Sequence, residues 1–170
     1  PHPGEAAGLL NISVKEVQAD RLKAAKDLHL KFGGIVVLKG HGTIIYDGNT
    51  PYLCSVGGPE LGIAGSGDVL SGLIGSLVSQ GLEPIDAAIA GVALHSGAGN
   101  QFTKNTGVIG LAASELIPLI RDCSLFPSDA SDERLCVDSG GRRTIKKKKI
   151  TTYTAPTTTH KQYNNTMTPT

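Results

Sequence analysis

Apolar positions follow a helical and then a strand-like spacing in the first part of the chain. Between residues 14 and 31 they recur three or four positions apart, and Ser13 stands three residues before Glu16, as in a capping box. Gly33 and Gly34 end this predicted helix. Residues 35–38 are continuously apolar and mostly β-branched, which is typical of a strand buried in a parallel sheet.

A hairpin is predicted next. The runs 43–46 and 51–54 have strand composition, and they flank Asp47, Gly48 and Asn49. Glycine and asparagine tolerate the positive φ that a tight turn between two strands requires.

The rest of the regular pattern is helical. Residues 56–68 hold five glycines in thirteen positions and lead directly into apolar residues with helical spacing at 69–78. Pro84 suits the first turn of a helix over 84–100, whose alanines and glycines permit close packing, and a last helix is expected over 112–121. Interleaved strands and helices of this kind predict a layered α/β fold.

Composition limits the class of protein. The 170 residues, 39% hydrophobic and 4% aromatic, suffice for one core. No apolar run approaches the roughly 18 residues of a membrane span, and no basic segment followed by an apolar one marks a secretory signal at the start. We therefore expect a cytoplasmic protein without a membrane partner.

Charge separates a body from a tail. Residues 1–122 hold 8 Lys and Arg against 11 Asp and Glu, whereas residues 123–170 hold 8 against 4. Apolar periodicity stops near Ser124, so we predict one domain over 1–122 and a disordered, low-complexity tail over 123–170. The lysines at 146–149 lack interleaved aromatics, and a solvated tail is favoured over a nucleic-acid site.

The cysteines predict no cross-link or metal site. Cys54, Cys123 and Cys136 are widely spaced, odd in number and form no CxxC pair. Reduced thiols are the expected state.

Residues 65–68, Gly-Ser-Gly-Asp, open an apolar helix and form the sharpest local motif. Glycines allow a tight turn close to a ligand, and the free N–H groups of a helix start attract phosphate or a developing oxyanion. Asp68 is placed to accept a proton from an attacking hydroxyl, although an acid in the first turn also simply stabilises a helix. Local spacing does not decide between these two roles.

Two further segments carry polar groups that suit a ligand. Lys39, Gly40, His41, Gly42 and Thr43 follow the end of a buried strand, where α/β proteins commonly bind ligands. Taken alone, an ordinary loop with a surface lysine is the preferred interpretation.

The second segment is the opening Pro-His-Pro-Gly-Glu, which places His2 and Glu5 in a proline-framed loop before the first helix. A polar substrate site and a simple turn are equally compatible with it. His95, inside an alanine-rich helix, is expected to be packed and hydrogen-bonded rather than catalytic. The chain contains no P-loop, no Rossmann GxGxxG after a strand and no GxSxG elbow.

In this order, the segments 1–5, 37–43, 64–72, 94–99 and 110–115 resemble the ADP/ATP-dependent NAD(P)H-hydrate dehydratases of the ribokinase-like superfamily. The resemblance covers nearly all of residues 1–122 and none of the tail. The GSGD turn is shared across the superfamily, whereas the HPGE opening and the KGxxT loop are more specific.

The resemblance implies an activity and its residues. Such enzymes use ADP or ATP, with Mg²⁺, to phosphorylate the C6 hydroxyl of hydrated NADH or NADPH, and loss of phosphate restores the dihydropyridine. It implies that His2 and Glu5 contact the hydrated dinucleotide, and that Asp68 meets the substrate hydroxyl as a base. The loop from Lys39 through Thr43, together with Gly67, would hold the adenine nucleotide, and the Gly65, Ser66 and Gly67 amides would stabilise the transferred phosphoryl group. The family also implies a homo-oligomer, a tetramer.

The departures from the family keep alternatives open. The chain begins at what resembles the middle of the family's domain, so we expect an incomplete ribokinase-like fold with an exposed sheet edge. Glu60 replaces the commoner residue of the glycine-rich run and places a carboxylate near the expected nucleotide. A small-molecule kinase of the same superfamily, such as a hydroxymethylpyrimidine or hydroxyethylthiazole kinase, and an inactive nucleotide-binding module are the alternatives.

Overall fold

The computed structural model describes residues 1–125, and for residues 124 and 125 it describes the backbone only. Residues 126–170, which make up most of the tail predicted over 123–170 and include Cys136 and the lysines at 146–149, lie outside the described residues. The elements are, in chain order, α1 (Pro3–Leu10), α2 (Val14–Ala19), α3 (Arg21–Phe32), β1 (Val36–Leu38), β2 (Thr43–Tyr46), β3 (Pro51–Cys54), a 3₁₀ turn (Pro59–Leu61), α4 (Ser66–Ser79), α5 (Pro84–Asn105) and α6 (Ala113–Leu125).

The described strands form an antiparallel sheet in the order β1-β2-β3. Val37 pairs with Ile45, and Ile45 pairs with Tyr52 on its other side. The predicted hairpin is confirmed: the Asp47 carboxylate accepts the N–H groups of Asn49 and Thr50 at 2.8 and 2.7 Å in the turn. The expectation of a parallel ladder for β1 was wrong for the described residues, because the short 39–42 connection can join only antiparallel neighbours.

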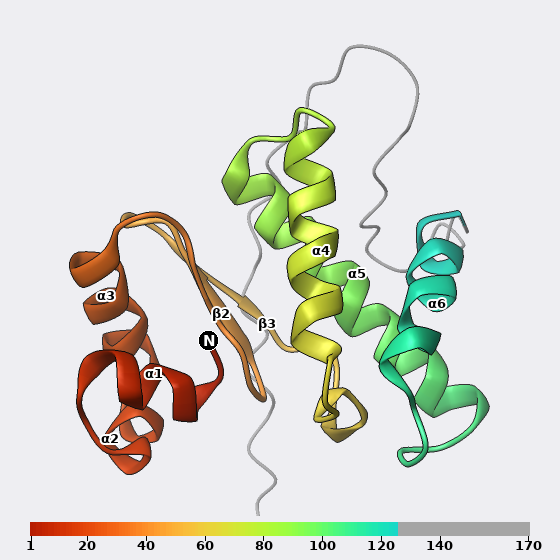
Figure 1. Ribbon diagram of the computed structural model, residues 1–170, viewed down its shortest axis with the longest axis horizontal. Coiled ribbons are helices and arrows are strands. Elements are labelled where there is room, and N and C mark those ends of the chain that lie inside the picture. The colour runs from red at the N-terminus through yellow and green to blue at the C-terminus, as the bar shows by residue number, and fades with distance from the viewer. Residues whose placement is uncertain (126–170) are drawn as a thin grey trace, which may run out of the picture. The chain divides into compact units, whose positions relative to one another are not determined.

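Helices cover both faces of this sheet (Figure 1). On one face, Ala25 and Leu28 of α3 pack with Leu38 and Ile44, together with residues of α1 and α2. On the other face, Ile45 packs with Leu70 of α4 and Val92 of α5. The described residues therefore form the predicted layered α/β arrangement, and α6 packs against α4 and α5 away from the sheet.

The predicted helix over 14–31 is two helices, which corrects the sequence interpretation. Asp20 leaves the helical conformation at φ −146° and ψ 85°, and its carboxylate accepts the Lys23 N–H at 2.9 Å as the N-cap of α3. A helix restarted by an internal cap keeps the same apolar spacing, so periodicity alone does not reveal the break. The capping box of Ser13 and Glu16 at the start of α2 is confirmed.

The opening segment also differs from expectation. Residues 1–5 were predicted to be a loop, but α1 begins at Pro3 with His2 as its N-cap. The imidazole takes the place of the usual Ser, Thr, Asp or Asn, and its Nδ1 accepts the N–H groups of Gly4 and Glu5. Because histidine is an unusual N-cap, the sequence pattern did not predict a helix that begins at Pro3.

Small residues bring α4 and α5 close together, as predicted. A Cβ at Gly91 would lie 2.6 Å from Cγ1 of Ile74, so only glycine fits there. Helix α5 extends to Asn105, beyond the predicted end near residue 100. Among the described residues no helix is both long and apolar enough to span a membrane, and Cys54 and Cys123 are free thiols.

Candidate functional site

The start of α4 presents the glycine turn. Gly65 is its N-cap in the left-handed conformation at φ 83°, and no side chain caps this end. The Ser66 N–H donates to the Ile63 carbonyl at 3.3 Å, whereas the Gly67 N–H has no acceptor among the described residues. The Gly65 N–H also has no acceptor among the described residues, so Gly65 and Gly67 both present free donors at the start of α4, where the helix dipole favours an anion.

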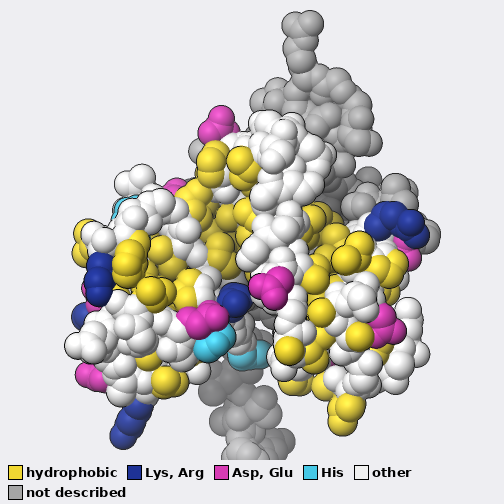
Figure 2. Space-filling model, viewed as in Figure 1, with side chains coloured by type: hydrophobic (Ala, Val, Ile, Leu, Met, Phe, Trp, Pro, Cys, Tyr) yellow, Lys and Arg dark blue, Asp and Glu magenta, His cyan; other side chains and the backbone are white. Residues whose placement is uncertain are grey.

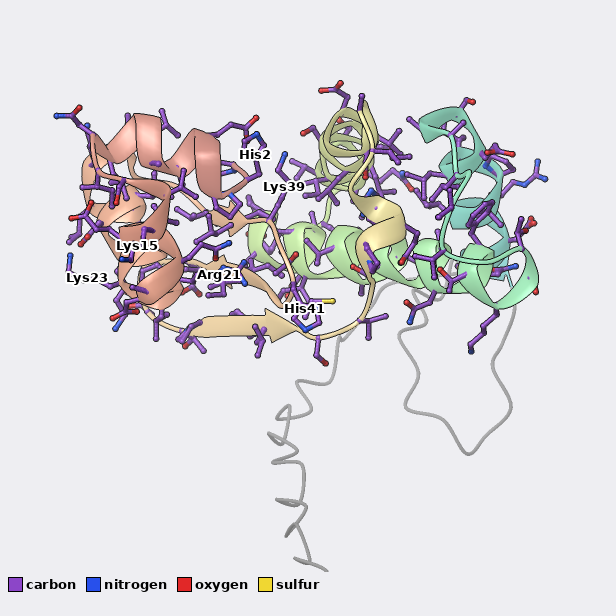
Figure 3. The ribbon with its side chains drawn as sticks, turned by 90° about the horizontal axis from the view of Figure 1, so that it is seen from below. His2, Lys15, Arg21, Lys23, Lys39 and His41 are labelled. Atoms are coloured by element: carbon purple, nitrogen blue, oxygen red, sulfur yellow. The ribbon has the colours of Figure 1, made fainter. Side chains whose placement is uncertain are left out.

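Lys39 meets this turn from the end of β1. A Cβ at Gly67 would lie 2.7 Å from the Lys39 ammonium, so the missing side chain is what lets the ammonium lie over α4. The same ammonium lies 3.7 Å from Oε2 of Glu5 at the start of α1. Three predicted segments, far apart in sequence, thus meet at one place, and Figure 3 shows His2 and Lys39 next to each other there.

His2 and Glu5 form a capping box. The Glu5 carboxylate accepts the His2 backbone N–H at 2.6 Å, and Nε2 of His2 lies 3.5 Å from its other oxygen. The hydrogen bond from the His2 backbone is the largest cause that lowers the pKa of Glu5, and Lys39 adds to it. Glu5 is therefore an anion beside the Lys39 cation at neutral pH, and Figure 2 shows acidic, basic and histidine side chains gathered on this face.

The loop between β1 and β2 contains two left-handed glycines. Gly40 has φ 144° and Gly42 has φ 71°, and the Thr43 hydroxyl donates to the Gly40 carbonyl at 3.2 Å. His41 is exposed. Arg21 of α3 contacts this loop from beneath, a contact that the sequence analysis missed because a lone arginine after a helix cap carries no motif.

Asp68 lies in the first turn of α4 and is exposed. Its carboxylate makes no hydrogen bond or ion pair to any described residue. Because no neighbour engages it, this carboxylate is available to a ligand hydroxyl.

A cavity of about 470 Å³ opens beside Gly67, between β1 and α4. Its polar end is formed by Lys39, Gly67 and Ser71, and its apolar wall includes Val37, Leu70 and Ile74. A lining of apolar side chains with a few polar groups is common in small-molecule sites. Asp68 is not part of the cavity wall but follows Gly67 directly.

Two buried polar residues support the turn. His95 of α5 is packed and hydrogen-bonded, as predicted, with Nε2 at 3.1 Å from both the hydroxyl and the carbonyl oxygen of Ser66. Burial lowers the pKa of His95. Glu60 is only 3% exposed, and its carboxylate accepts the Gly58 N–H at 2.8 Å against α5. This carboxylate therefore shapes the glycine-rich loop from within.

The described residues contain no group of three His, Cys, Asp or Glu side chains that would hold a metal ion. A magnesium ion of the kind expected here is held mainly by nucleotide phosphates and water, with one or two carboxylates.

The fold and the glycine turn define a ribokinase-like protein. A ribokinase-like superfamily protein of known structure from Enterococcus faecalis aligns with a TM-score of 0.60 and 28% identity, over 72% of this chain and 42% of that one. The structure of the ADP/ATP-dependent NAD(P)H-hydrate dehydratase of Bacillus subtilis, crystallised with ATP and Mg²⁺ and soaked with CoA, aligns with a TM-score of 0.68 and 29% identity. That alignment covers 72% of this chain and 46% of the Bacillus chain.

Sequence comparison narrows the class. The ADP-dependent (S)-NAD(P)H-hydrate dehydratase of Neisseria meningitidis is 46% identical over 123 residues, which are 71% of this chain and 42% of the relative. The family model of the NAD(P)H-hydrate dehydratases matches residues 1–121, and the chain belongs to that family. It spans less than half the length of each of these three proteins.

Proposed function

We propose that this chain carries the nucleotide side of an ADP- or ATP-dependent (S)-NAD(P)H-hydrate dehydratase site. One observation carries the proposal: Lys39, Glu5 and the free Gly67 N–H lie together, and Gly67 is followed directly by Asp68, whose carboxylate makes no hydrogen bond or ion pair with a described residue. This arrangement offers a cation and a helix start to phosphate oxygens, and a base to a hydroxyl.

Each residue then has a defined task. Asp68 accepts the proton of the C6 hydroxyl of hydrated NADH or NADPH as that oxygen bonds to the terminal phosphorus of the donor, whose bond to the leaving nucleotide breaks. Lys39 and the Gly67 N–H stabilise the charge on the transferred group. Magnesium, when bound with the nucleotide, neutralises phosphate charge. Phosphate then leaves with a proton from the adjacent carbon, which restores the dihydropyridine; phosphate is a far better leaving group than hydroxide.

The other assignments belong to the same proposal. The loop from Lys39 through Thr43 holds the adenine nucleotide, and His2 with Glu5 contacts the hydrated dinucleotide. The Gly65 N–H faces the transferred phosphoryl group together with that of Gly67, whereas the Ser66 N–H, which was expected to do the same, donates to the Ile63 carbonyl. A cytoplasmic location and homo-oligomeric assembly are further predictions from family membership.

Recovery of absorbance at 340 nm from hydrated NADH tests the function. The purified chain is incubated with ADP or ATP and Mg²⁺, beside a version extended by the segment that precedes the matched region in the relatives. Recovery by the chain itself supports the proposal in full. Recovery by the extended version alone assigns the activity to the longer domain and makes the isolated chain inactive, while recovery by neither favours the kinase alternative or the inactive module.

A further inference from the structure

The guanidinium of Arg21 donates to three backbone carbonyls, one at the last residue of β1 and two in the loop that follows it. Nη1 donates to the carbonyl of His41, and Nη2 donates to those of Leu38 and Lys39 at 3.1 and 3.3 Å. Figure 3 shows Arg21 and His41 on this side of the sheet. A planar guanidinium presents several donors in a fixed arrangement, so one side chain can orient several carbonyls at once.

Arg21 makes these contacts without a carboxylate partner. None of the described acidic side chains forms an ion pair with it, and its Nε is buried without a hydrogen bond. Among the described residues, these three carbonyl oxygens are the acceptors that face the charge. A half-buried arginine that donates to three carbonyls at the end of β1 and in the loop, and pairs with no described acid, is placed to hold the loop.

The orientation of these carbonyls also fixes the direction of the N–H groups in the same peptides. The described peptides contain no cis bond, and in a planar trans peptide the N–H points away from the C=O. The Leu38 carbonyl belongs to the peptide whose N–H, on Lys39, donates to the Pro1 carbonyl at 2.8 Å. The carbonyls of Lys39 and His41 belong to the peptides of Gly40 and Gly42, whose N–H groups have no acceptor among the described residues.

Glycine is required where the guanidinium approaches the loop. A Cβ at Gly40 would lie 3.0 Å from Nη2 of Arg21, and the φ of 144° disfavours any side chain there. The two residues are therefore fitted to each other: one supplies the donors, and the other leaves the space for them.

We propose that Arg21 is a positioning residue for the nucleotide, which it does not touch. By holding the Lys39 and His41 carbonyls, it turns the Gly40 and Gly42 N–H groups away from α3, toward acceptor atoms of the bound adenine nucleotide. This inference rests on the proposed function, because it gives the loop the nucleotide as its ligand.

The test compares Arg21→Gln and Arg21→Lys in the full chain, or in the extended version if only that one is active. Nucleotide affinity is measured by calorimetry with ADP or ATP and Mg²⁺, and the KM values for nucleotide and for hydrated NADH are measured separately. In R21Q the loop after β1 loses its hydrogen bonds to a charged donor. Nucleotide binding should therefore weaken by about tenfold or more, with little change in the KM for hydrated NADH. R21K, which retains charge but presents a point donor, should fall between R21Q and the wild type.

Lys26→Met is the matched control, because it removes an exposed charge from the same helix. It should leave both KM values unchanged. Equal loss of affinity for both substrates, or unchanged nucleotide affinity in a folded Arg21 variant, overturns the role of Arg21. If R21Q fails to fold, R21K decides the question by the same KM comparison. If the wild-type protein neither binds nucleotide nor converts hydrated NADH, the proposed function itself is refuted. That result differs from those that overturn only the role of Arg21.

Discussion

Nε2 of His95 lies 3.1 Å from both the hydroxyl and the carbonyl oxygen of Ser66, so a residue in the middle of α5 holds the first residue of α4. Both side chains are buried. The glycine turn is therefore fixed from below by a polar contact, and Gly67 and Asp68 project from a supported helix end.

This contact predicts a pH dependence of stability. Burial is the main cause that lowers the pKa of His95, the Lys39 charge lowers it further, and the Ser66 carbonyl opposes the shift. Below the ordinary histidine value of 6.5 the unfolded chain binds a proton that the folded chain does not, so the free energy of unfolding falls as the pH is lowered through this range. Denaturant unfolding between pH 8 and pH 5 measures the slope.

His95→Leu should flatten that slope. It should also cost about 1–3 kcal/mol near neutral pH, because it leaves the buried Ser66 hydroxyl without its partner. His41→Gln, at an exposed position of the β1–β2 loop, is the control and should retain the wild-type slope. An unchanged slope in H95L would show that another group carries the pH dependence.

Helices and strands could be predicted from the sequence where the spacing of apolar residues and the turn residues by themselves determine the element. The strand over 35–38 and the hairpin that follows have a continuous apolar run and a turn of Asp, Gly and Asn, and both are present. The helix break at Asp20 and the cap at His2 were missed, since each depends on one side chain that bonds to the backbone.

In the candidate site, too, some residues could be predicted from motifs and others could not. Its glycines, Lys39 and Asp68 stand in recognisable motifs. Arg21 and the buried carboxylate of Glu60 act through hydrogen bonds to backbone groups that folding brings together. Such contacts cannot be predicted from the spacing of residues in the sequence. The meeting of Lys39 with Glu5 likewise depends on the packing of α1 beside β1.

Gly67→Ala should damage binding without damaging the fold. The added Cβ would lie 2.7 Å from the Lys39 ammonium, which is the end of a flexible side chain and can move away. We expect nucleotide affinity to fall by about tenfold, as when a charge-assisted contact is lost, while the melting temperature is maintained.

Gly72→Ala, in the same helix, is its control. A Cβ there would meet nothing within 4 Å. The replacement should stabilise the chain by up to about 1 kcal/mol, because alanine favours a helix more than glycine does, and it should leave affinity unchanged. Equal affinities in the two variants would contradict the placement of nucleotide over Gly67.

Glu5→Gln and Glu16→Gln form a second matched pair. Each carboxylate accepts the backbone N–H of its capping partner, at 2.6 Å in α1 and 2.8 Å in α2. Both pKa values are lowered, by the His2 backbone in α1 and by the Ser13 side chain in α2. The stability that each carboxylate adds is present above its ordinary value of 4.5 and is lost as the pH falls through its lowered value.

The two variants should therefore lose stability in the same direction but differ in activity. Of the two, only Glu5 lies at the candidate site, where it is proposed to contact the hydrated dinucleotide, so only E5Q should raise the KM for hydrated NADH, by about tenfold for a lost charge-assisted contact. Steady-state kinetics at fixed, saturating nucleotide measure this. A similar KM in E5Q and E16Q would reduce Glu5 to a helix cap.

Asp68→Asn decides whether the acid at the start of α4 is a base or a helix-stabilising charge. Asparagine has nearly the same size as aspartate, and the Asp68 carboxylate makes no hydrogen bond or ion pair with a described residue. The substitution therefore removes only the favourable charge at a helix start. As a base, its loss should lower kcat by about 10²–10⁴-fold while nucleotide affinity stays within a small factor. Asp86→Asn removes the corresponding first-turn acid of α5 and should leave kcat unchanged. If D68N and D86N lower stability alike and neither lowers kcat, Asp68 is only the acid of a helix start; if D68N alone slows turnover, the proton of the substrate hydroxyl passes to Asp68.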